Sequence, residues 1–433
     1  MRLFELLLRL RQYLQPLLDE VGHPDSGWNE PRRRFVLGLL VGLYGAGTTM
    51  LSEIVRKIPG KASIRHRYKA ADRMLAKVDL VTVAAAQTAR LADGVGKGWI
   101  VALDTSDIRK LYATKMEALA TIYDGSTGAL GQGYQLVTAC AFHLAGRAKA
   151  QPRPLLFEVF SSAEEDFKSE NTIWMDAIER IHAVAPDATV AIDRAADSGK
   201  ILGKLLDLKQ PFVIRLQVHD HSRHMLFGEA SRARVRDAWK ETTPHGELVA
   251  VRLADDGKRT PYRCDFGSLR VRLPGRAERL WLCSFDSTDH EQPMVLLTNV
   301  RADTAAQTAD ILATYLGRWA AEDMHRWAKQ EFGLEAVRLL TWKRLRNMVA
   351  AVWLAMGFAA SIGGAPDARP VLTAMELRGQ QLRRTHTDGQ FWGYALARGV
   401  RAVLQDGRRL LRVFDFLRPP PPTPQRSLFG ARA

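Results

Sequence analysis

The sequence has 433 residues, 46% of them hydrophobic, which is enough for one elaborated domain with a large core plus helical additions. Its 62 Lys and Arg residues outnumber 47 Asp and Glu residues, and the formal net charge of +15 favours a polyanion as partner. The three cysteines lack CxxC spacing and histidines at zinc spacing, so the sequence indicates neither a disulfide framework nor a structural zinc site and fits a reducing cytoplasm.

Residues 1–95 are expected to be helical. Glu5, Arg9 and Arg11 interrupt the first apolar run, which predicts an amphipathic helix rather than a signal peptide. The stretch 35–52 has no charged residue and approaches the length of a membrane span. Its glycines and threonines favour a buried helix, a Gly-rich turn and a second helix beginning near Thr49, so no membrane partner is expected.

The segment 52–77 is strongly basic. Its arginines and lysines accompany two short helical patterns, separated near residue 60. One interpretation is a helix-turn-helix-like DNA-binding unit. The other is an ordinary helical hairpin with a solvated basic face, and the segment alone does not choose between them.

Apolar strand patterns begin at Trp99 and continue to about residue 298, with one helical pattern around residues 171–184. The predicted strands cover residues 99–103, 134–144, 155–160, 188–192, 211–218, 248–253, 268–273, 279–285 and 294–300. Strands mixed with a helix predict an α/β fold with a mixed sheet.

The pattern suggests a division of the chain into six parts. Their expected limits are 1–95 (helical and DNA-binding), 96–217 (first part of the α/β core), 218–292 (β-rich insertion), 293–362 (second part of the core), 363–418 (C-terminal helices) and 419–433 (a Pro-rich tail, extended or disordered).

Two aspartates follow apolar strand patterns directly: Asp104 after residues 99–103 and Asp193 after residues 188–192. Open α/β sheets gather their chemistry at the carboxyl ends of strands. Either aspartate taken alone also has a structural explanation, because Asp often ends a strand or caps the next helix.

The stretch YLGRWAAEDMHRWAK places four polar groups on one predicted helix. At roughly 100° per residue, the face is shared by Tyr315, Arg318, Glu322 and Lys329. Two aspartates and one glutamate from separate elements can hold two divalent cations, as in phosphoryl transfer. Carboxylate ligands without thiolates select Mg²⁺, for which Mn²⁺ can substitute.

These residues resemble the DDE transposases of the insertion-sequence-four family. The family signature Y-(2)-R-(3)-E-(6)-K is matched by Tyr315, Arg318, Glu322 and Lys329, and the motifs DTSD and IDRAAD at Asp104 and Asp193 resemble its two aspartate motifs. The resemblance covers residues 30–360. It implies an RNase H-like core, a helical N-terminal region that binds the DNA ends of the transposable element, and cut-and-paste transposition.

The resemblance also implies a role for each residue. Asp104, Asp193 and Glu322 would ligate two Mg²⁺ ions. The expected contacts with the DNA backbone come from Tyr315, Arg318, Lys329 and Arg194. The implied partners are double-stranded DNA, as terminal inverted repeats and target, and a second copy of the chain in the synaptic complex; the implied location is the cytoplasm, at the nucleoid.

Neighbouring residues complicate this assignment. Four further acids, Asp107, Asp197, Asp323 and Glu331, lie close to the triad in sequence. Trp281 is the nearest candidate for stacking on a flipped base, but an alternating strand residue is more often core. Trp319 and Trp327 are expected to be packing residues.

Two alternatives from other classes stay open. One is a transposase-derived DNA-binding or inhibitor protein without catalysis, against which the three intact carboxylates count. The other is an RNase H-like metal-dependent nuclease, against which the Tyr-Arg-Glu-Lys pattern counts.

Overall fold

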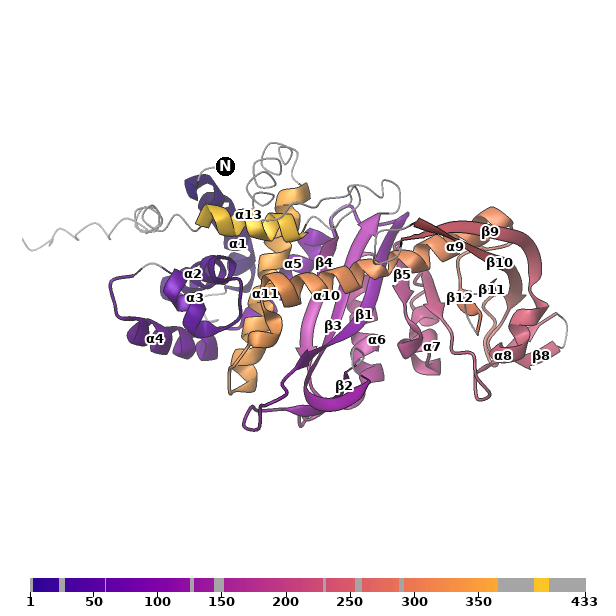
Figure 1. The fold of residues 1–433 in the computed structure, drawn as a ribbon, viewed down its shortest axis with the longest axis horizontal. Helices are drawn as coiled ribbons and strands as arrows, with labels where there is room; N and C mark the ends of the chain where they lie inside the picture. Colours follow the sequence, from indigo (N-terminus) through magenta and orange to yellow (C-terminus); the bar gives the residue numbers. More distant parts are fainter. Residues whose placement is uncertain are drawn as a thin grey trace, which may run out of the picture.

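The computed structural model describes residues 3–22, 28–58, 60–124, 128–143, 152–228, 231–253, 259–287, 292–364 and 393–404. Helices from the beginning and the end of the chain lie together at one end of the molecule, and a twisted sheet crosses its middle (Figure 1). Strands from the second half of the chain lie at the other end.

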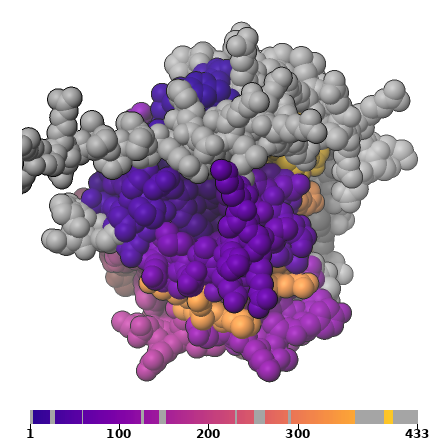
Figure 2. Space-filling model, turned by 90° about the vertical axis from the view of Figure 1, so that its left-hand side faces the viewer, coloured from indigo at the N-terminus to yellow at the C-terminus, as the bar shows by residue number. Residues whose placement is uncertain are grey.

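The described part of residues 1–95 is helical, as expected. Its helices are α1 (Leu3–Val21), α2 (Glu30–Ala46), α3 (Leu51–Lys57), α4 (Ile64–Lys77) and α5 (Leu80–Leu91). Helix α2 begins where the Asn29 side chain accepts a hydrogen bond from the amide of Arg32, and it ends at Gly47, whose φ of 64° suits glycine. The predicted sequence of buried helix, turn and second helix is confirmed. These helices form much of the end face seen in Figure 2.

In the part of the chain that the structure describes, two apolar helical segments have the length and composition to span a membrane, the second only if a bent pair of helices counts as one span. The first is α11 (Trp342–Gly364), whose stretch 342–362 is 89% buried inside the protein, and the second is the pair α2 and α3, bent by 100°. Burial on all sides is typical of the core helix of a large protein. The same burial explains the uncharged stretch 35–52.

The main sheet has ten strands, in the order β2-β3-β1-β5-β6-β12-β11-β10-β9, with β4 paired to β3. Their bounds are β1 (Trp99–Arg109), β2 (Ala120–Asp124), β3 (Ala129–His143), β4 (Arg153–Phe160), β5 (Thr189–Ile192), β6 (Phe212–Arg215), β9 (Thr243–Leu253), β10 (Arg259–Val271), β11 (Leu280–Asp286) and β12 (Met294–Thr298). With the flanking helices, this is a mixed α/β fold consistent with an RNase H-like core.

The centre of the sheet is parallel and its two sides are antiparallel. Strand β5 pairs in parallel with both β1 and β6, while β3 pairs with β1, and β12 with β6, in the antiparallel sense. The strands of the predicted β-rich insertion therefore continue the central sheet through β12. Within that stretch, β7 (His224–Phe227) and β8 (Ser231–Arg234) form a small separate sheet, followed by α8 (Val235–Ala238) and η3 (Trp239–Glu241).

Helices cover both faces of the central strands. Helices α6 (Glu170–Val184) and α7 (Gly199–Asp207) pack with the main core, while α9 (Ala305–Gly317) and α10 (Trp319–Glu331) cross the other face (Figure 1). Near the start of α10, Ala321 packs against the sheet in a cluster that includes the small side chains of Ala102 and Ala191. These short side chains let the helix approach the ends of β1 and β5 closely.

Helix α13 (Gly393–Leu404) returns to the N-terminal helices and packs against α2, α10 and α11. It lies within the stretch predicted as C-terminal helices. The predicted Pro-rich tail, residues 419–433, lies outside the described residues.

Candidate catalytic site

The ends of the parallel strands place the two aspartates side by side. Leu103 of β1 is paired with Ile192 of β5, so Asp104 and Asp193 are the next residues on neighbouring strands. Ala102 and Ala191, two residues before Asp104 and Asp193, face α10. Because side chains two apart in a strand point to the same face, both carboxylates lie on the face that α10 covers. This register places both aspartates at the same edge of the parallel pairing, while their role as metal ligands stays a prediction.

The expected end of the first strand was wrong. Strand β1 runs on to Arg109, so Asp104 lies within it and is paired with Thr138 of β3. The antiparallel pairing with β3 extends β1 beyond its short parallel neighbour β5. Asp104 therefore marks the end of the parallel pairing, while the strand itself continues.

The expected single helix is also interrupted. Helix α9 ends at Gly317 and α10 begins at Trp319, with Arg318 between them at φ −53° and ψ −25°. These angles are helical, so the chain direction is kept and the two helices follow one another across the sheet (Figure 1). The side chains on either side of the junction still reach the same edge of the sheet.

Arg318 is surrounded by the three carboxylates. Its Nη1 is 2.6 Å from Asp104 Oδ2, and its Nη2 is 3.3 Å from Glu322 Oε1 and 4.0 Å from Asp193 Oδ2. The Arg318 side chain is 8% exposed, against 34% for Glu322. Three acids around one base leave a local formal charge of −2 at neutral pH, in a cluster that opens to solvent on the Glu322 side.

The other members of the predicted helix face also contact acids. Tyr315 donates its hydroxyl to Asp193 Oδ1 at 2.9 Å, and burial raises the pKa of Tyr315 to about 12, so it keeps its proton. Lys329 Nζ is 3.1 Å from both Asp107 Oδ1 and Glu335 Oε1. Arg194, the first residue of η2 (Arg194–Ala196), is exposed next to the site.

The proton affinity of the cluster reflects its burial. Desolvation raises the pKa of Asp104 to about 6, and the charges of Asp193 and Glu322 act in the same direction. Arg318 and the backbone amide of Thr105 act against it. A carboxylate with this surplus of negative neighbours is stabilised by an added cation.

The geometry of the cluster bears on whether it can hold a metal ion. Over the described residues, no group of three or more His, Cys, Asp or Glu side chains is arranged closely enough to hold a metal ion as it stands. The three carboxylates instead converge on the guanidinium of Arg318, which supplies the positive charge that a metal ion would otherwise supply. Oxygen ligands alone suit Mg²⁺ or Mn²⁺, so the donor set fits such an ion once these side chains close around it.

The four acids that complicated the assignment have partners away from this cluster. Their contacts are Asp107 with Lys329, Asp197 with Arg223, Asp323 with Arg326, and Glu331 with Arg398 and Arg401. Asp197, for example, has a buried carboxylate that also accepts the amide of Gln217 at 2.9 Å. Tertiary contacts thus separate the three clustered acids from their sequence neighbours.

Two tryptophans are placed differently from expectation. Trp319, expected to pack, is 58% exposed at the start of α10, whereas Trp327 is buried as expected. Trp281, the candidate for base stacking, is partly buried and donates its indole N–H to Asp303 at 2.8 Å. The sequence reasoning also passed over His325 and Thr138, which are joined by a buried 2.6 Å hydrogen bond behind the cluster. The only signal for His325 was its position one helical turn after Glu322.

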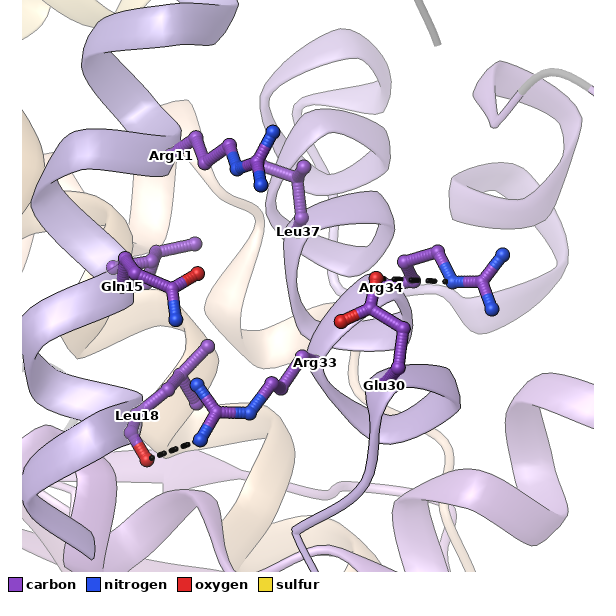
Figure 3. Close-up of a pocket in the computed structure, with 8 residues that line it drawn as sticks. Arg11, Gln15, Leu18, Glu30, Arg33, Arg34 and Leu37 are labelled. Carbon is purple, nitrogen blue, oxygen red and sulfur yellow. Dashed lines mark hydrogen bonds and ion pairs between the residues drawn. The ribbon is translucent and has the colours of Figure 1, made fainter. Parts of the chain in front are cut away.

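One cavity in the described part of the chain lies apart from this site, between α1 and α2. It holds about 40 Å³ and is lined by Arg11, Arg33 and Arg34 among others (Figure 3). Arg34 is paired with Glu30 at 3.4 Å, and Arg33 donates to the carbonyl of Leu18. The pocket is small and its charges are partly balanced, so it does not compete with the carboxylate cluster as the functional site.

A comparison with known protein families matches a region that contains two of the three clustered acids. Residues 163–357 match a protein family described as Transposase DDE domain. This region is similar to that domain over 195 of the 433 residues. The matched stretch contains Asp193 and Glu322, while Asp104 precedes it and joins the site through the pairing of β1 with β5. A search of curated proteins found no match.

Proposed function

We propose that this protein is a DDE transposase of the insertion-sequence-four type, which moves a DNA element by cut-and-paste strand cleavage and strand transfer. The observation that carries the proposal is the convergence of Asp104, Asp193 and Glu322, from three elements, on a single positive charge. The DDE domain match and the net charge of +15 support DNA as the substrate.

The three carboxylates would hold two Mg²⁺ ions, for which Mn²⁺ can substitute. Bound there, the ions would stabilise the attacking and leaving oxygens of a phosphodiester. Tyr315 fixes one oxygen of Asp193 by its hydrogen bond and leaves the other oxygen available. Arg318 balances part of the negative charge and orients Asp104 and Glu322 toward one point.

The DNA backbone is proposed to contact Tyr315, Arg318, Lys329 and Arg194. Arg194 is exposed directly after Asp193, and Lys329 is about three-quarters buried beside Asp107. Lysine and arginine side chains bind phosphates by charge and hydrogen bonding. These contacts would hold the end of the element against the carboxylates.

A second DNA surface is proposed on the N-terminal helices. Helix α4 buries Ala71 and Leu75 and exposes the basic side chains of Arg65, Lys69 and Arg73. Its position after the short helix α3 suits either a helix-turn-helix-like unit or a hairpin with a basic face. The terminal inverted repeat is the DNA expected on this surface, in a dimer that pairs two ends at the nucleoid.

The test is cleavage of a labelled duplex carrying the element's own end, with Mg²⁺, Mn²⁺ or EDTA. Wild type is expected to nick the DNA only with metal, and Glu322→Gln is expected to lose roughly 10³-fold or more of this activity while still binding the end. Asp323→Asn is the matched control, because this acid is adjacent on the same helix and pairs outward with Arg326.

Each other outcome points to a different protein. Binding of the end without cleavage by wild type would favour the inhibitor or DNA-binding alternative. Metal-dependent cleavage without preference for the end would favour an RNase H-like nuclease. Cleavage that survives Glu322→Gln but not Asp323→Asn would show that the glutamate is wrongly assigned.

A further inference from the structure

A hydrogen-bond chain runs behind the carboxylate cluster. Thr138 of β3 is the strand partner of Asp104, and its hydroxyl donates to the backbone carbonyl of Asp104 at 3.2 Å. The same hydroxyl oxygen is 2.6 Å from Nε2 of His325 on α10. Thr138 is fully buried and His325 is 8% exposed. The chain therefore connects the strand that carries Asp104 to the helix that carries Glu322.

The direction of these bonds fixes the state of the histidine. A threonine hydroxyl has one proton, and here the carbonyl of Asp104 accepts it. Nε2 of His325 must then be the donor to the threonine oxygen. Burial lowers the pKa of His325 to about 3, helped by the nearby charges of Lys329 and Arg318, so the ring is neutral with its proton on Nε2.

Because His325 lies close to Glu322 on α10, this hydrogen bond can affect where the Glu322 carboxylate is placed. The two residues are three apart on α10, about 4.5 Å along the axis and about 60° around it. Elsewhere α10 contacts the sheet through Ala321, which packs in a cluster with Ala102 and Ala191, and through the partly exposed ion pair of Lys329 with Asp107 of β1. Methyl groups allow a close approach but do not specify how the helix is rotated about its axis, whereas a buried hydrogen bond does.

Resting on the proposed function, we propose that Thr138 and His325 are positioning residues for the metal site. Their bond sets the rotation of α10, and thereby the position of the Glu322 carboxylate, relative to Asp104. Partners behind metal ligands typically change metal affinity by about 10- to 100-fold when they are removed.

The test measures Mn²⁺ affinity directly, by titration of the full-length protein followed by the electron paramagnetic resonance of free Mn²⁺. Thr138→Val and His325→Leu are each expected to weaken Mn²⁺ binding by about 10-fold or more. Thr138→Ser keeps the hydroxyl, and His325→Gln keeps a donor near the Nε2 position, so both are expected to stay within about threefold of wild type. Affinity for end DNA without metal should not change.

Matched controls remove equivalent bonds elsewhere. Thr298→Val deletes a buried hydroxyl of β12 that donates to the carbonyl of Phe212 at 2.5 Å, and His182→Leu deletes a ring that contacts Gln210 at 2.9 Å. Both are expected to leave Mn²⁺ affinity unchanged even where they lower the melting temperature. Loss of affinity in these controls to the same degree would reduce the role of Thr138 and His325 to general stability and overturn the proposal.

Glu322→Gln separates this inference from the function on which it rests. If Glu322→Gln weakens Mn²⁺ binding and the folded variants Thr138→Val and His325→Leu do not, the positioning role is refuted and the metal site stands. If wild type shows no Mn²⁺ binding that depends on Glu322, the proposed function itself fails. Should the apolar variants not fold, the combined Thr138→Ser and His325→Gln variant still tests the proposal, because a loss of Mn²⁺ affinity of about 10-fold with hydroxyl and donor intact would overturn it.

Discussion

The two ends of α10 hold contrasting acid and base clusters. Near its start, Glu322 and two aspartates share the one guanidinium of Arg318, and the Glu322 side chain is 34% exposed. At its end, Glu331 is 4% exposed and is paired with Arg398 at 2.6 Å and with Arg401 at 3.3 Å. The first cluster has a surplus of negative charge, and the second has a surplus of positive charge.

The difference separates an acid with a structural role from an acid that is a candidate metal ligand. Glu331 is fully paired by two bases from α13, and Arg401 also donates to the carbonyls of Glu331 and Tyr44. That cluster joins α10, α13 and α2 and has no capacity for a further cation. The cluster at Glu322 is open and short of positive charge, which is the condition for binding a divalent ion.

The largest effect is expected when the same substitution is made at both ends of the helix. Glu331→Gln removes the carboxylate that pairs with Arg398 and Arg401, so two largely buried guanidinium groups lose their counter-charge. The free energy of unfolding should fall by about 3 kcal/mol. Glu322→Gln relieves repulsion among like charges and should not lower the stability of the metal-free protein. Urea denaturation in EDTA measures both variants. A lower stability for Glu322→Gln than for Glu331→Gln would contradict the conclusion that Glu331, and not Glu322, stabilises the metal-free fold.

The next effect concerns metal addition. A cation bound only by the folded protein should raise the free energy of unfolding by about 2.7 kcal/mol at a hundred times its dissociation constant. This gain is expected with Mn²⁺ for wild type and for Asp323→Asn, and it should disappear in Asp193→Asn. Thermal unfolding with and without Mn²⁺ measures it, and an equal gain in Asp193→Asn would place the ion elsewhere.

A pH-dependent effect is expected from His325. Its pKa is about 3 in the folded state against an ordinary value of 6.5, so the folded protein keeps the ring neutral while the unfolded chain takes up a proton below pH 6.5. The stability contributed by this group is complete above pH 6.5 and is lost as the pH falls toward 3, by up to about 1.4 kcal/mol per pH unit.

The stability difference between wild type and His325→Gln isolates this contribution, because both proteins share the opposing titration of Asp104. Metal-free urea denaturation from pH 7 to pH 4 should show the difference shrinking as the pH falls. A constant difference over this range would show that the ring is not held neutral in the folded state.

The smallest effect is expected at the solvent-facing pair of the same helix. Arg326 and Asp323 lie 3.2 Å apart with side chains 56% and 41% exposed. Arg326→Gln should change the free energy of unfolding by about 0.5 kcal/mol or less. If Arg326→Gln lowered the free energy of unfolding as much as Glu331→Gln, solvent exposure would not predict which ion pairs of α10 stabilise the fold.

Much of the candidate site could be predicted from the sequence. Asp104 and Asp193 follow apolar strand patterns, and Glu322 stands in a motif with Tyr315 and Arg318, so local spacing was informative. The break of the helix at Arg318 was not predicted, because residues on both sides favour helix and the junction keeps helical angles. The true end of β1 was missed because its extension depends on pairing with β3.

The sequence by itself determined the fold class, the strand pattern and the identity of the three clustered acids, because period and spacing are local properties of the chain. Tertiary structure decided which acids are free for chemistry. Asp197 and Glu331 lie close to Asp193 and Glu322 in the sequence, but Arg223 and the arginines of α13 hold them in ion pairs away from the cluster. Those partners lie 26 or more positions away in the chain, so their electrostatic effect appears only when the elements have packed.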